Sequence, residues 1–145
     1  MKLMRRSRAA WEGPIDDGGG TIALGSGAFQ GEYSVRGRTE EGQRTTNPEE
    51  LIGAALAGCF TMSLAGVLTE EERPAARLDT TATVYLEKRE EGHVIPRIDI
   101  ETTGHVPGVD AAEFQELAER AERGCTVSKV LAAAEISVRA TLEPR

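Results

Sequence analysis

The stretch "NPEELIGAALAGCFTMSLAGVLTEEE" (residues 47–72) decides how the rest of the chain must fold. It opens with signals of a helix start. Asn47 is expected to cap the helix, Pro48 suits the first helical position, and Glu50 is expected to complete a capping box. Residues 51–68 then carry no charge. The sequence therefore predicts one long helix with apolar or small residues on every side.

A helix that is apolar all round is either buried in protein or spans a membrane. Its eighteen uncharged residues are long enough for a span. Nine of the eighteen, however, are Gly, Ala, Ser or Thr, and both flanks are acidic with no basic cluster to set an orientation. We therefore expect a long central buried helix wrapped by β-sheet, and no membrane partner.

Segments with β-strand character precede and follow this helix. The N-terminal third holds three, separated by Gly- and Asp-rich turn signals: RRSRAAWEG, TIALGSGAF and EYSVRGR. After the helix, apolar and polar residues alternate from Leu78 to Leu86, and a turn at residues 90–93 leads to a second strand, Ile95 to Thr103. These two strands are expected to pair as an antiparallel hairpin with one solvent-exposed face.

The C-terminal third predicts two helices and a closing strand. Residues 110–124 form an amphipathic pattern that begins at an Asp110 cap and ends at Gly124, residues 125–134 predict a short helix, and residues 135–143 predict a strand. There are no repeats, low-complexity segments or linkers. The fold class predicted is α+β, in a single domain over residues 1–145.

Composition excludes some partners. The net charge of −7 argues against a nucleic-acid surface, because phosphate binding needs a positive footprint. The basic start "MKLMRRSR" is followed by the polar, acidic "AAWEGPIDDGGG", so it lacks the apolar segment of a signal peptide. We expect a cytoplasmic protein.

The chain has two cysteines, Cys59 and Cys125, 66 positions apart, and no C-x-x-C motif. In a reducing compartment they are either two unrelated buried thiols or a pair that cycles between thiol and disulfide. Cys125 lies at the junction of two predicted helices, where backbone N–H groups would stabilise a thiolate. His93 and His105 complete no zinc-type spacing with the cysteines, so no metal is expected.

Two motifs together resemble the OsmC/Ohr family of thiol-dependent peroxidases: "TNPEELIGAALAGCF" (residues 46–60) and "GCTVSKVL" (residues 124–131). The likeness is closest to the OsmC (osmotically inducible protein C) branch and runs from "AAWEG" to "EISVRATLE". It implies an intertwined homodimer in which antiparallel β-sheets enclose long central helices. It also implies reduction of organic hydroperoxides, and of hydrogen peroxide in the OsmC branch, in defence against oxidative and osmotic stress. No metal or organic cofactor is implied. The reductant is an external dithiol, which in the Ohr branch is a lipoylated protein.

The resemblance also assigns roles to residues. Cys59 matches the peroxidatic cysteine, and Cys125 matches the resolving cysteine that forms a disulfide with it. Arg38 is the best match for the arginine that keeps the Cys59 thiol ionised, and Glu49 for the acidic residue that orients this arginine. Arg36 is the alternative, since the family usually has an aromatic residue after its arginine and this chain has none there. Many relatives also carry proline in place of the threonine after the second cysteine, a difference expected not to affect the chemistry.

The spacing of these residues raises a geometric question. Glu49 and Cys59 are ten residues apart, roughly 15 Å along a straight helix. Both can join one cluster if the helix breaks, if Arg38 bridges them, or if each site takes groups from both chains of a dimer. We expect the last, a site at the dimer interface. Two other functions remain open. One is an acyl-thioester hydrolase of the hotdog type with Glu49 as the base, and the other is a non-catalytic dimeric ligand-binding protein.

Overall fold

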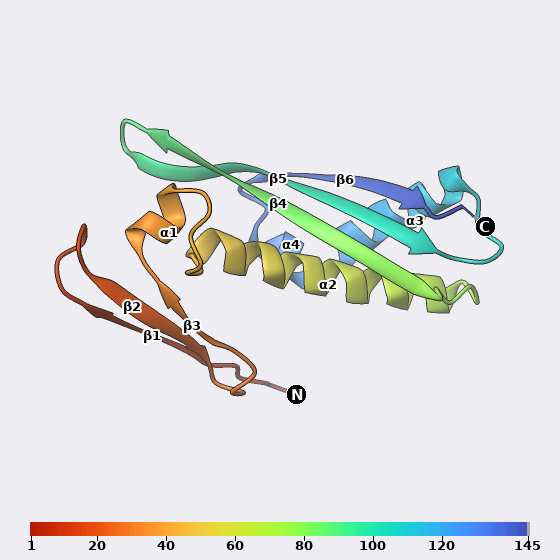
Figure 1. Cartoon of the computed structure of the whole chain (residues 1–145). Helices are drawn as coiled ribbons and strands as arrows, with labels where there is room; N and C mark the ends of the chain where they lie inside the picture. Colours follow the sequence, from red (N-terminus) through yellow and green to blue (C-terminus); the bar gives the residue numbers. More distant parts are fainter. Residues whose placement is uncertain (145) are drawn as a thin grey trace. The chain divides into compact units, whose positions relative to one another are not determined.

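The computed structural model describes residues 1–144, and the chain forms two compact units, one over Met1–Leu51 and one from Ile52 onward. The first unit contains β1 (Ser7–Glu12), β2 (Gly19–Leu24), β3 (Gln30–Tyr33) and α1 (Val35–Thr39). Helix α2 (Pro48–Glu70) begins in the first unit and runs through the second, which adds β4 (Arg77–Arg89), β5 (Gly92–His105), α3 (Ala111–Gly124), α4 (Thr126–Val130) and β6 (Glu135–Leu142) (Figure 1). The expectation of a single domain stays a prediction.

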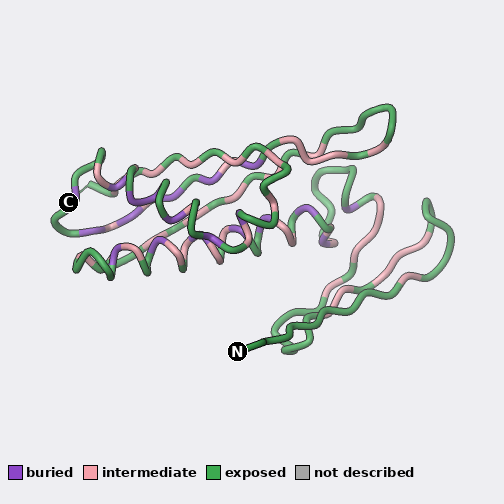
Figure 2. Tube along the Cα trace, turned by 180° about the vertical axis from the view of Figure 1, so that it is seen from behind, coloured by how far each residue is buried: buried purple, intermediate pink, exposed green. Residues whose placement is uncertain are grey.

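The first unit is built on an antiparallel sheet in the order β1–β2–β3, as the N-terminal pattern predicts. Because side chains alternate along a strand, the register places one apolar set on the same face. This apolar sheet face consists of Ala9, Trp11, Ile22, Leu24 and Tyr33. The rings of Trp11 and Tyr33 meet edge to face at 5.5 Å. Leu24 is nevertheless 37% exposed, and no residue of the three strands is buried (Figure 2).

Residues 35–39 form the short helix α1, although the sequence predicts β structure there. The Ser34 hydroxyl accepts the Gly37 N–H at 3.0 Å, which caps the turn. A side chain at Gly37 would come within 2.3 Å of the Thr45 hydroxyl, so the helix also depends on this glycine. Arg38 therefore lies on a helix rather than on a strand.

The start of α2 is only partly as predicted. Asn47 does cap the helix, since its side-chain oxygen accepts the Glu50 N–H at 2.8 Å. The expected capping box is wrong, because the Glu50 carboxylate accepts the Thr46 hydroxyl at 2.7 Å instead of returning to Asn47. Thr46 is held there by a bridge to Tyr33, which places its hydroxyl within reach of Glu50.

The sheet of the second unit has the order β4–β5–β6, with α2, α3 and α4 on one of its faces (Figure 1). The antiparallel β4–β5 hairpin is confirmed. The expectation of purely antiparallel sheets is wrong for β5 and β6, which pair in parallel. The reason is the connection between them, since α3 and α4 carry the chain back across the sheet before β6 begins.

The core of the second unit lies between this sheet and one face of α2. Leu56, Phe60, Leu64 and Leu68, spaced four residues apart, are fully buried. They pack in one cluster with Ile98 and Ile100 of β5 and Phe114 of α3. By length and composition α2 would also qualify as a membrane span, but this face has the packing of a core helix.

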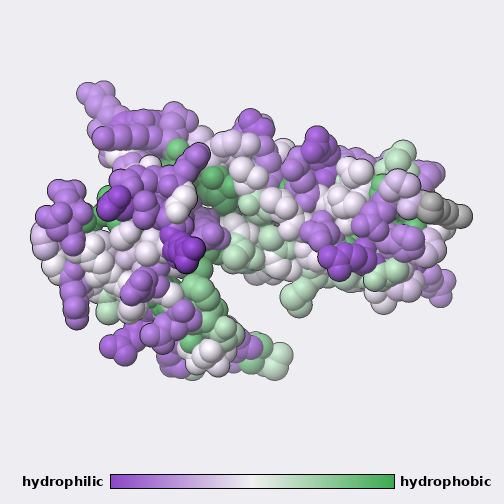
Figure 3. Space-filling view, in the orientation of Figure 1, coloured by the Kyte–Doolittle hydropathy of each residue, from purple (hydrophilic) through white to green (hydrophobic). Residues whose placement is uncertain are grey.

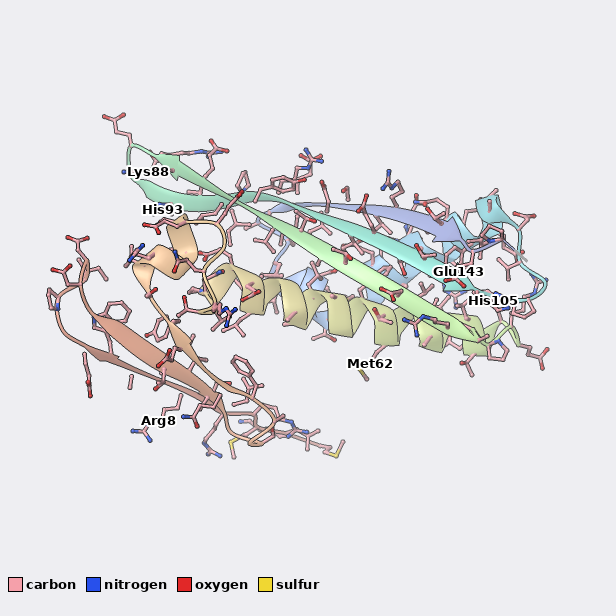
Figure 4. The ribbon with its side chains drawn as sticks, in the orientation of Figure 1. Arg8, Met62, Lys88, His93, His105 and Glu143 are labelled. Atoms are coloured by element: carbon pink, nitrogen blue, oxygen red, sulfur yellow. The ribbon has the colours of Figure 1, made fainter. Side chains whose placement is uncertain are left out.

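The opposite side of α2 is exposed in the single chain. This small-residue face consists of Ala54, Ala55, Gly58, Met62, Ala65 and Gly66. Met62 is 77% exposed and projects away from the sheet (Figure 4). Figure 3 shows neutral and hydrophobic residues over this stretch of the helix. The sequence predicts that α2 is buried on all sides, but in the single chain only one face of the helix is buried.

The junction between α3 and α4 also differs from the prediction. Asp110 caps α3 as expected, its carboxylate accepting the Glu113 N–H at 2.9 Å. Gly124, however, is the last residue of α3 rather than a left-handed residue beyond it, and Cys125 ends the helix with φ −72° and ψ 120°. Cys125 thus separates two helices directly, with no loop between them.

Candidate active site

The structure brings the two cysteines together although they are 66 residues apart. Cys59 lies in the middle of α2, and Cys125 ends α3 and begins α4. Both thiols are free, and they lie close enough for each to shift the pKa of the other. Cys125 is 1% exposed, whereas Cys59 is partly exposed. Cys125 is therefore enclosed in the core, whereas Cys59 can be reached from solvent.

The surroundings of the two sulfurs favour different protonation states. Burial raises the pKa of Cys59, and the neighbouring Cys125 adds to this effect, so that the N–H groups of Val127 and Thr126 only partly offset the rise. Burial also acts to raise the pKa of Cys125, but nearby groups that can donate to its thiolate, namely the Cys59 thiol, the N–H and hydroxyl of Ser128 and the Val127 N–H, outweigh it and lower the pKa. Within the second unit, the surroundings thus favour the thiolate form of Cys125 over that of Cys59.

Arg38 and Glu49 form a second pair, within the first unit. Two guanidinium nitrogens of Arg38 contact the same oxygen, Oε1 of Glu49, at 2.8 and 2.7 Å. Glu49 is 7% exposed, and a buried carboxylate of this kind needs a cation nearby. Its other oxygen, Oε2, is buried and has no hydrogen-bond partner among residues 1–144. The carboxylate therefore orients Arg38 and keeps one acceptor free.

Arg36 is engaged elsewhere. It forms an exposed ion pair with Glu40, one turn along the chain, at 3.1 Å. Hydrogen bonding to Glu40 raises the pKa of the Arg36 guanidinium. Of the two arginines that the sequence leaves open, Arg38 is the one in contact with Glu49.

Sequence reasoning missed part of the setting of the cysteines. Ser128 lies buried beside Cys125 and is not among the predicted site residues, although a serine three residues after a cysteine at a helix start is a recognisable signal. The N–H of Thr126, the residue after Cys125, acts to lower the pKa of Cys59, and a proline at this position would have no N–H to do so.

Comparison with known proteins shows where such a chain belongs. Residues 40–141 match the model of a family described as OsmC-like protein. Peroxiredoxin OsmC from Escherichia coli (strain K12) is 42% identical over 134 residues, which make up 92% of this chain and 93% of the relative. The organic hydroperoxide resistance protein OhrA from Bacillus subtilis (strain 168) is 32% identical over 94 residues, which make up 63% of this chain and 64% of that protein.

Solved structures agree with the fold. A crystal structure of an OsmC like protein from Mycoplasma pneumoniae has a TM-score of 0.77 to this chain at 17% identity, and covers 99% of this chain and 100% of its own. This likeness confirms the predicted OsmC-like α+β fold. The family match and the 42% identical relative show, in addition, to which family the chain belongs. The chain belongs to the OsmC-like protein family, in the OsmC branch of the OsmC/Ohr group.

Proposed function

We propose that the chain is a thiol peroxidase that reduces organic hydroperoxides and hydrogen peroxide. The Cys59 thiolate attacks the O–O bond, becomes a sulfenic acid and releases an alcohol or water. The Cys125 thiol then condenses with this sulfenic acid, which releases water and forms a Cys59–Cys125 disulfide. An external dithiol reduces the disulfide. The single observation that carries this proposal is the proximity of two free thiols 66 residues apart, each of which shifts the pKa of the other.

The raised pKa of Cys59 means that its thiolate needs further stabilisation before it can attack. In this proposal the stabilising cation is Arg38, whose guanidinium is always charged and is held by Glu49. Glu49 and Cys59 lie ten residues apart on α2, roughly 15 Å along a straight helix. We therefore infer that the complete site combines groups from two chains.

Two surfaces support a homodimer as the functional unit. The small-residue face of α2 is exposed in the single chain, and the apolar sheet face of the first unit has no buried residue. Exposed apolar surfaces of this kind mark interaction sites, and most soluble oligomers are symmetric. We infer a dimer that covers both surfaces, located in the cytoplasm, where a thiol pair is kept reducible.

Substitution of Met62 by glutamate tests the dimer. A charge in the middle of the small-residue face is expected to convert the dimer into monomers and to lower peroxidase turnover, because burying an unpaired carboxylate is costly. Light scattering coupled to size-exclusion chromatography measures the mass. Thr83→Glu, on the exposed face of β4, is the matched control and is expected to remain dimeric. A wild-type monomer with full activity would contradict the two-chain site.

Thiol counting tests the peroxidase itself. One equivalent of cumene hydroperoxide, added to the reduced protein, is expected to remove both free thiols, measured with and without denaturant. A hotdog-type thioesterase or a non-catalytic ligand-binding protein needs no contact between two thiols, so in those cases the thiols would persist. An unchanged thiol count in the native protein would refute the proposed function.

A further inference from the structure

The two sulfurs of the pair differ in how far another molecule can reach them. Cys125 is 1% exposed and belongs to the hydrophobic core of the second unit, whereas Cys59 only borders that core. Thiol–disulfide exchange requires the attacking thiolate to reach one sulfur of the disulfide and the other sulfur to leave. Access therefore favours attack on Cys59.

The structure also provides a donor for the sulfur that would leave. Ser128 is 3% exposed, and its Oγ is a buried polar atom without a hydrogen-bond partner among residues 1–144. Its hydroxyl and its N–H nevertheless lower the pKa of Cys125, since both can donate to the thiolate. A buried hydroxyl without a partner is unfavourable, so an adjacent anion that accepts its proton gains stability.

We propose that the external dithiol attacks Cys59 Sγ of the oxidised protein, that Cys125 Sγ is the leaving sulfur, and that the Ser128 hydroxyl stabilises it. In this step a reductant thiolate bonds to Cys59 Sγ while the Cys59–Cys125 bond breaks. Cys125 Sγ takes the electron pair and accepts the Ser128 hydrogen bond. The second thiolate of the reductant then attacks the reductant sulfur bound to Cys59, which releases the Cys59 thiolate and leaves the reductant as a disulfide. The inference rests on the proposed function, because it concerns reduction of the same disulfide.

The attacked sulfur can be mapped directly. The full-length protein is oxidised with diamide, treated briefly with glutathione, quenched in acid, alkylated and digested with trypsin. Mass spectrometry is expected to find glutathione on the Cys59 peptide over the Cys125 peptide by about ten to one, because leaving-group stability and access act together. The same disulfide unfolded in concentrated urea should lose this preference. Equal or reversed labelling in the folded protein would overturn the proposal.

The use of diamide separates this inference from the peroxidase proposal. If diamide forms the disulfide and cumene hydroperoxide does not, the proposed function fails while the direction of exchange can still be measured. If diamide forms no Cys59–Cys125 disulfide, the inference fails as well.

Substitution of Ser128 tests the donor. Ser128→Ala is expected to slow reduction of the diamide-formed disulfide by dithiothreitol about tenfold, the effect of one hydrogen bond to a charged group. Ser128→Thr keeps the hydroxyl and is expected to restore most of the rate. In a Cys59→Ser background, where Cys125 is the only cysteine, thiolate absorbance at 240 nm should appear at higher pH after Ser128→Ala than with Ser128 intact. An unchanged titration would remove Ser128 from the mechanism.

Discussion

Replacing Cys59 by serine is expected to reduce steady-state peroxide turnover at least about a thousandfold, to the background of the reductant alone. A serine hydroxyl is a far weaker nucleophile at neutral pH, and its oxygen cannot take the place of sulfur in a sulfenic acid. The assay follows consumption of cumene hydroperoxide with dithiothreitol or dihydrolipoamide as the reductant.

Cys125→Ser is the matched control for this result. It retains Cys59, so it is expected to consume one equivalent of peroxide and then stop with a sulfenic acid that dimedone traps. Substantial turnover by the Cys59→Ser protein, or a Cys125→Ser protein that never forms a sulfenic acid, would contradict the assigned order of the two cysteines.

Arg38→Ala is expected to lower the rate of Cys59 oxidation about a hundredfold at neutral pH. A nearby cation favours the charged form of a thiol, so if Arg38 acts on Cys59 as proposed, its loss is expected to raise the pKa of Cys59 and to move the alkaline rise of the rate to higher pH. Stopped-flow measurement of single-turnover oxidation between pH 6 and about pH 10 gives both the rate and its midpoint.

Two further variants make the Arg38 result interpretable. Arg36→Ala removes an equally charged neighbour that is exposed and paired with Glu40, so it is expected to oxidise at nearly the wild-type rate. Arg38→Lys keeps a cation beside the buried Glu49. This variant therefore distinguishes a loss of activity caused by misfolding around an unpaired carboxylate from one caused by loss of the guanidinium. A strong effect of Arg36→Ala together with a weak effect of Arg38→Ala would reverse the assignment of the two arginines.

Local patterns in the sequence predicted the elements well where neighbouring residues decide the structure. Asn47 caps α2, and alternation between Leu78 and Leu86 gives the inward face of β4. The local predictions failed where a contact with a residue distant in sequence changed the local hydrogen bonding. Thr46, held by Tyr33, draws the Glu50 carboxylate away from the expected capping box.

The sequence by itself determined the long apolar helix, the α+β class, and the two cysteine motifs through which the family is recognised. Periodicity and capping depend on residues a few positions apart, and a resemblance depends on residue identity and spacing, so both can be read from a linear chain. Neither gives the distance between segments that are remote in sequence.

Only the tertiary structure decided that Cys59 and Cys125 lie beside each other, that Arg38 rather than Arg36 contacts Glu49, and that Ser128 lies buried beside the second sulfur. The parallel pairing of β5 and β6 likewise follows from the path of the chain through α3 and α4. These contacts join segments whose separation is set by packing of the whole unit, since a side chain's neighbours in the core come from several elements at once.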